Sequence, residues 1–151
     1  MSAFPPVEEL APHAEGMLLI DRVVAAEGEL VRSEATIRAD NIFFQRGRGV
    51  PAYVGFELMA QTISAYDGLK RRANGKKPAI GLLLGCRKYA VARPFFVEGE
   101  TLTIESTSLL GEEGMASFDC RILDAAGAEL AAATINVYRP ADGESFMQMQ
   151  P

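Results

Sequence analysis

Apolar residues occupy almost every side of the stretch Val50–Arg72. It opens with Pro51, which suits the first turn of a helix because that turn does not need the missing N–H. No further proline follows within the stretch. A helix that is apolar on all sides is normally buried in a protein core. Polar residues such as Glu57 and Gln61 interrupt the apolar run, so it does not span a membrane. We therefore predict a buried helix over Val50–Arg72.

The rest of the chain has the short apolar runs and alternating patterns that are typical of strands. The predicted strands are Met17–Ala26, Leu30–Ala39, Ala79–Ala92, Thr101–Leu110, Met115–Leu123 and Glu129–Tyr138, with a short helical turn at Val7–His13. Gly81 and Gly85 indicate a bulge or a close approach to the backbone in the third strand. A single helix this apolar needs a curved sheet to enclose it. The pattern therefore predicts an α+β domain, with an antiparallel sheet wrapped around one long central helix.

Composition narrows the class of protein. The 151 residues suffice for one domain with a core, and the net charge of −5 gives no support for nucleic-acid binding. The two cysteines lack metal-ligand spacing and indicate buried thiols in a reducing compartment. No basic segment followed by an apolar run opens the chain, so we expect a cytoplasmic protein. The single histidine, His13, excludes a metal site built from several histidines, and we expect no metal.

Glu57 is the unusual residue of the predicted helix. A carboxylate on a buried helix is unfavourable unless it is paired, protonated or lining a cleft. Gln61 follows four residues later and shares its face. The helix start, Ala52–Gly55, would offer N–H groups and a dipole that favour a developing oxyanion. We expect chemistry on this face. Two alternatives stay open: an ion pair of Glu57 with Arg46 or Arg48, and a hydrogen bond from Gln61 to a neighbouring strand.

Four short motifs stand in a distinctive order along the chain. They are Pro12-His13 with Met17–Val23 (MLLIDRV), Asn41 with Phe43–Gln45 (FFQ), Glu57–Gln61 (ELMAQ), and Gly85–Lys88 with Arg93-Pro94 and Gly99-Glu100. Over residues 10–139 this order resembles the hotdog-fold 3-hydroxyacyl-(acyl carrier protein) dehydratases of fatty acid synthesis. The helix start, GVPAYVGFELMAQ, is similar to that of the ApeP-like subfamily from aryl polyene gene clusters. The resemblance implies a single hotdog domain over residues 1–140 and a flexible tail over 141–151.

The resemblance also implies a reaction, the elimination of water from a 3-hydroxyacyl thioester. This reaction needs a base, an acid for the departing hydroxyl, and donors for the charge on the thioester oxygen. By resemblance, Glu57 takes the role of the acid. The family's catalytic histidine follows FFQ, but here the loop reads RGRG, residues 46–49. His13, the only imidazole, is the remaining candidate base, or else a structural histidine at the start of the first strand.

The same resemblance implies binding residues and partners, without a cofactor. The expected substrate-binding residues are Gln61, Ala52, Gly55 and Tyr53, and Arg46 and Arg48 are expected to dock a carrier protein. Acyl carrier proteins are acidic, so arginines beside the site would steer one toward it. Gly55 could instead only permit close packing of helix and sheet. We expect a homodimer or a heterodimer with a second hotdog subunit, because a sheet of this size leaves edges to be covered.

Three functions stay open. The first is dehydration of 3-hydroxyacyl chains on acyl carrier protein to enoyl thioesters, in fatty acid or aryl polyene synthesis. The second is a non-catalytic hotdog subunit that pairs with an active dehydratase, which the missing loop histidine favours. The third is a hotdog acyl thioesterase, against which the LLIDRV and ELMAQ motifs argue.

Overall fold

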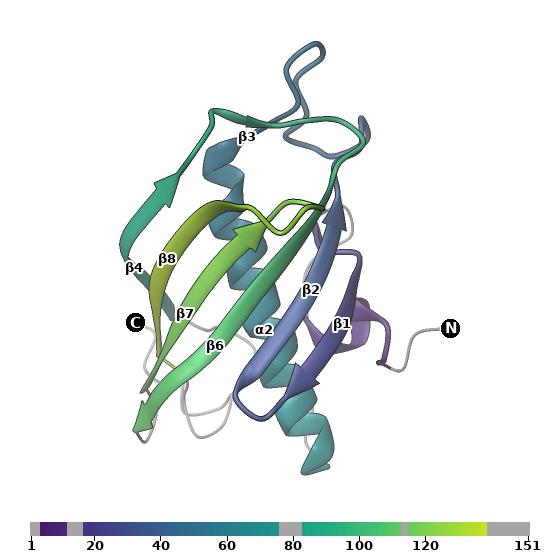
Figure 1. Ribbon diagram of the computed structural model, residues 1–151. Helices are drawn as coiled ribbons and strands as arrows, with labels where there is room; N and C mark the ends of the chain where they lie inside the picture. Colours follow the sequence, from purple (N-terminus) through teal and green to yellow (C-terminus); the bar gives the residue numbers. More distant parts are fainter. Residues whose placement is uncertain (1–3, 12–16, 76–82, 113–114, 139–151) are drawn as a thin grey trace, which may run out of the picture.

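A single curved antiparallel sheet forms most of the domain. The computed structural model describes residues 4–11, 17–75, 83–112 and 115–138. The sheet order is β1-β2-β6-β7-β8-β4, and every neighbouring pair is antiparallel. The strands are β1 (Arg22–Glu27), β2 (Leu30–Thr36), β4 (Leu83–Val91), β6 (Thr101–Glu112), β7 (Met115–Leu123) and β8 (Glu129–Tyr138). The helix α2 (Gly55–Ala73) lies along the sheet's inner face (Figure 1). The predicted α+β architecture around one central helix is confirmed.

The central helix begins later than the sequence pattern indicated. Val50 and Pro51 form the short strand β3, which pairs with β5 (Phe95–Phe96), and the 3₁₀ turn η1 (Ala52–Val54) leads into α2. Pro51 fits this place because its backbone is extended, with φ −55° and ψ 140°. The helix predicted from Val50 therefore starts at Gly55, since pairing with a distant strand holds the preceding backbone extended.

The first predicted strand is also shorter than expected, and β1 begins at Arg22 rather than Met17. The side chain of Gln61 binds the backbone of this stretch instead. Its Oε1 accepts the N–H of Leu19 at 2.6 Å and that of Ile20 at 3.3 Å, and its Nε2 donates to the carbonyl of Met17 at 2.7 Å. The helix therefore replaces a neighbouring strand as the partner of this backbone.

The helix α1 (Val7–Leu10) packs against α2. Gly68 permits this packing, because a Cβ at that position would lie 2.2 Å from the carbonyl oxygen of Leu10. Val7 and Leu10 are both buried. The central helix is thus covered from two sides, which explains why its sequence is apolar all round.

The C-terminal strands follow their sequence patterns closely. β7 and β8 have the predicted bounds, and β6 continues two residues further, through Glu112. The ladder between β4 and β8 shifts between Cys86 and Lys88, so the predicted bulge lies directly after Gly85. Among the described residues, no atom lies within 4 Å of the place that a Cβ on Gly85 would take. Gly81, His13 and the predicted tail over residues 141–151 lie outside the described residues.

Candidate functional site

Glu57 and Gln61 lie one turn apart on α2 and contact each other. The Nε2 of Gln61 donates to Oε1 of Glu57 at 3.1 Å. Gln61 is completely buried, whereas Glu57 is partly buried. The backbone of residues 17–20 holds the remaining polar atoms of the Gln61 amide, so its Nε2 meets the carboxylate in a fixed orientation. Gln61 therefore contacts both Glu57 and a neighbouring segment, which were alternatives at the level of sequence.

The backbone at the helix start is engaged within the protein. The N–H of Ala52 donates to the carbonyl of Pro94 at 2.8 Å, and the N–H of Gly55 donates to the carbonyl of Ala52. The hydroxyl of Tyr89 donates to the same Ala52 carbonyl. These bonds fix the turn that precedes α2. The donors expected at Ala52 and Gly55 thus already have acceptors, and binding a substrate oxyanion would require them to exchange partners.

Close packing requires a glycine at position 55. A Cβ on Gly55 would lie 2.2 Å from the hydroxyl oxygen of Tyr89 and 3.0 Å from Cδ1 of Ile122. The packing role foreseen for this glycine is therefore present, beside any role in substrate binding. Tyr53, two residues earlier, is 65% exposed and so presents its ring at the surface beside the helix start.

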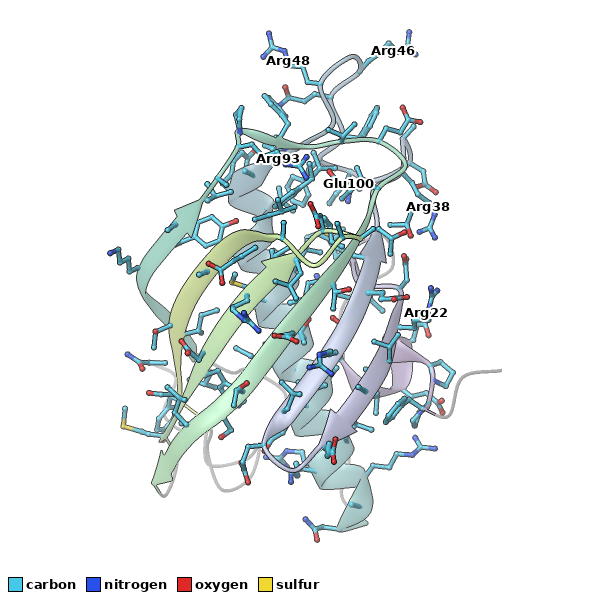
Figure 2. All side chains as sticks on the ribbon, viewed as in Figure 1. Arg22, Arg38, Arg46, Arg48, Arg93 and Glu100 are labelled. Carbon is cyan, nitrogen blue, oxygen red and sulfur yellow. The ribbon has the colours of Figure 1, made fainter. Side chains whose placement is uncertain are left out.

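Arg46 and Arg48 lie on a protruding turn. Gln45 and Gly49 bridge its two ends, and Gly47 and Gly49 take positive φ angles of 82° and 112°. We call residues 45–49 the arginine turn. Figure 2 shows both arginine side chains at its tip, pointing away from the domain. The guanidinium of Arg48 lies 5.9 Å from the centre of the Phe95 ring. The Arg46–Gly49 part of this turn reads RGRG and contains no histidine.

Arg93 and Glu100 both belong to the sequence motifs, and the structure shows that they form an ion pair. Their side chains meet at 2.6 Å between Nη2 and Oε1. Burial acts to raise the pKa of Glu100, but hydrogen bonds from Arg93 and from the N–H of Val97 outweigh it and hold that pKa below its ordinary value. The hydrogen bond to Glu100 raises the pKa of Arg93. The motifs Arg93-Pro94 and Gly99-Glu100 place opposite charges at the two ends of one loop.

A polar pocket of about 200 Å³ adjoins the segment that Gln61 holds. Asp21 accepts hydrogen bonds there from the N–H of Thr36 at 2.7 Å and from Arg38 at 2.8 Å, and this contact raises the pKa of Arg38. The lining residues are Leu18, Leu19, Asp21, Thr36, Arg38, Asp40 and Asn41. Of the site residues predicted from the sequence, those that the structure describes do not line this pocket.

Two further findings concern the described part of the chain. Within it, no group of three or more histidine, cysteine or acidic residues could hold a metal ion. None of its helices is long and apolar enough to cross a membrane. His13, the candidate base, lies outside this part of the chain, so its distance from Glu57 is not described.

Several solved structures are similar to this one. A chain of the dehydratase heterocomplex ApeI:P from Xenorhabdus doucetiae is 26% identical, covers 98% of this chain and 99% of its own, and superposes with a TM-score of 0.87. AziG from S. sahachiroi shares the fold at 15% identity and a TM-score of 0.62, over 87% of this chain and 98% of its own. The E. coli PaaI protein from the phenylacetic acid degradation operon shares the fold at 14% identity and a TM-score of 0.61, over 80% of each chain.

Comparison with curated protein sequences found no match. The model of the ApeP-like family, described as ApeP dehydratase, matches residues 5–148. This match covers nearly the whole chain and includes the helix start with Glu57 and Gln61. The chain therefore has the hotdog fold and belongs to the ApeP-like dehydratase family.

Proposed function

We propose that this chain dehydrates 3-hydroxyacyl chains carried on acyl carrier protein, in the cytoplasm, during fatty acid or aryl polyene synthesis. The observation that carries the proposal is the carboxylate of Glu57, partly buried at the helix start and held by the buried amide of Gln61. A general acid must stand in a fixed position to deliver its proton to a leaving group. The contact with Gln61 supplies that fixed position.

The reaction assigns one proton transfer to each of two groups. A base removes the proton from the carbon next to the thioester carbonyl, and the electron pair forms the new carbon–carbon double bond. The bond from the third carbon to its hydroxyl breaks, and Glu57 donates a proton so that water leaves. His13 is the base that this chain could supply. A second hotdog subunit is the alternative source of the base.

The partner we propose is a second hotdog subunit, as another copy or as a different chain. Support comes from the similarity to a chain of the ApeI:P heterocomplex over almost the full length of both chains. The arginine turn supports a second candidate function. This turn carries no histidine and points away from the domain, which is what a non-catalytic subunit of an active dehydratase would show (Figure 2).

The arginine turn is also our candidate for docking the carrier protein. Arg46 and Arg48 are exposed at the end of the domain where α2 begins. Two adjacent positive charges on a chain of net charge −5 would steer an acidic carrier protein to this end. Tyr53 is exposed at the same helix start and offers an aromatic contact.

Substituting Glu57 tests the proposal. We expect Glu57→Gln to lower enoyl formation from a 3-hydroxyacyl-(acyl carrier protein) at least about 100-fold, because the amide cannot donate the proton. The assay is run on the chain alone and with its hotdog partner, and Glu27→Gln on an exposed part of β1 is the control. Unchanged turnover in Glu57→Gln would remove this residue from the mechanism. Activity that requires the partner and survives His13→Ala would assign the base to the partner, and release of free thiol would indicate a thioesterase.

A further inference from the structure

One ion pair closes the loop between β4 and β6. Arg93 and Glu100 are seven positions apart and share two hydrogen bonds, at 2.8 Å from Nη1 to Oε2 and at 2.6 Å from Nη2 to Oε1. The same carboxylate accepts the N–H of Val97, and Nη1 of Arg93 also donates to the carbonyl of Phe95 at 3.3 Å. Bidentate arginine–carboxylate ion pairs are strong and directional. We call residues 93–100 the clamp loop.

The clamp loop holds the segment that leads into α2. Within the loop, β5 pairs with β3 of that segment, and the carbonyl of Pro94 accepts the N–H of Ala52 at 2.8 Å. The loop is itself tied to the sheet, because Ile37 exchanges backbone hydrogen bonds with Gly99 and Glu100, at 2.8 Å and 2.9 Å. The helix start is therefore anchored to the end of β2 through this loop.

Two glycines of the held segment lie against Phe96 of the clamp loop. A Cβ on Gly49 would lie 2.0 Å from the carbonyl oxygen of Phe96, and a Cβ on Gly55 would lie 3.2 Å from Cζ of its ring. Phe96 of the clamp loop therefore lies against both ends of this segment, at Gly49 and at Gly55. Glu57 follows Gly55 by two residues, so a displacement of the segment would carry the carboxylate with it.

We infer that Arg93 and Glu100 are a positioning pair for the reaction, because their ion pair fixes the helix start and with it Glu57. The inference rests on the proposed function, since it concerns the placement of the proposed acid. Figure 2 shows both side chains at the end of the domain where α2 begins. Small errors in the placement of a reacting group lower the rate of chemistry much more than they lower substrate binding.

The test compares two glutamates that bind arginine equally closely. Glu100→Gln removes the charge from the clamp loop, and Glu34→Gln is the control because its exposed pair with Arg22 also has a length of 2.6 Å. We expect amide hydrogen exchange over residues 49–58 to be about tenfold faster in Glu100→Gln and unchanged in Glu34→Gln. In the active assembly, kcat of Glu100→Gln should fall about tenfold while KM stays within about twofold. Arg93→Lys keeps the charge but loses the bidentate hydrogen bonding of the guanidinium, so its hydrogen exchange and kcat should change by an intermediate amount.

The two readouts separate this inference from the proposed function. Equal exchange over residues 49–58 in the two glutamine variants would overturn the positioning pair, and so would faster exchange with an unchanged kcat. Absence of enoyl formation by the wild-type assembly would overturn the proposed function, and the exchange comparison would then still decide whether the pair fixes the helix start. If Glu100→Gln does not fold, Arg93→Lys against Arg22→Lys answers the same question.

Discussion

Gln61 joins the central helix to the backbone of residues 17–20 through one buried amide group. A glutamine amide has two donor hydrogens and an oxygen that accepts two hydrogen bonds. All four are used here, by Leu19, Ile20, Met17 and Glu57. A buried polar group with every bond formed is strongly oriented. The orientation of Glu57 is therefore coupled to the path of the N-terminal segment over the helix.

Replacement of Gln61 measures this coupling. The side chain introduced by Gln61→Met has a similar size but cannot form these hydrogen bonds. The substitution would leave the buried N–H of Ile20 and the partly buried groups of Met17 and Leu19 without this partner. Lost partners of buried groups cost about 1–3 kcal/mol each, so we expect the free energy of unfolding to fall by about 3 kcal/mol in urea titrations. Glu57→Gln is the control and should change it by less than about 1 kcal/mol. If Gln61→Met lowered the free energy of unfolding by less than about 1 kcal/mol, the hydrogen bonds of this amide would contribute little to stability.

Three strands are tied together on the outer face of the sheet by one carboxylate. Glu105 on β6 accepts hydrogen bonds from Arg32 on β2 and from Arg121 on β7. Its side chain is only 9% exposed. Burial acts to raise the pKa of Glu105, but the hydrogen bonds from Arg32 and Arg121 outweigh it and hold that pKa below its ordinary value.

This lowered pKa predicts how stability depends on pH. A carboxyl group with a lower pKa in the folded state stabilises the fold fully above its unfolded pKa of about 4.3, and stops doing so as the pH falls through the folded value. The arginines are 42% and 50% exposed, so we expect Glu105→Gln to cost only about 1 kcal/mol at pH 7. That difference from wild type should shrink in urea titrations below about pH 4. A difference that is the same at pH 3 and pH 7 would contradict this origin.

The ends of elements were predictable only where neighbouring residues determine them. β7 alternates between buried and outer positions, β8 does so from Ala131 onward, and their predicted bounds are confirmed. The errors fall where a distant partner decides the conformation. β5 holds Val50 and Pro51 extended, and Gln61 binds the backbone of residues 17–20. Local pattern carries no information about either partner.

The contacts of the candidate site, too, were predictable only where nearby residues determine them. Helical spacing alone placed Gln61 on the face of Glu57, and their contact follows from it. The engagement of the Ala52 N–H by Pro94 could not be read from the sequence, because it depends on how two loops meet. The pair of Arg93 and Glu100 could have been suspected from opposite charges at the two ends of one loop motif.

The sheet also has two unequal edges, formed by β1 and β4 (Figure 1). In the described part of the chain each pairs on one side only, β1 with β2 and β4 with β8. Each of their ladders has one register shift, but β1 has only six residues, whereas β4 has nine and ends with the exposed Val91. Long unpaired edges favour pairing with another chain. We therefore expect the proposed second hotdog subunit to pair along β4.

Two valines at the opposite edges allow a matched test of this expectation. Val91 on β4 is 40% exposed and Val24 on β1 is 38% exposed, so lysine at either place adds the same charge to a similarly open position. A lysine on a paired edge opposes association, so Val91→Lys should raise the Kd of the assembly at least about tenfold, a change of about 1.4 kcal/mol. Val24→Lys should leave the Kd unchanged, as measured by sedimentation velocity over a concentration series. A higher Kd in Val24→Lys alone would place the interface at β1. An unchanged Kd in both variants would exclude both edges, because a buried unpaired lysine lowers the affinity of a packed interface.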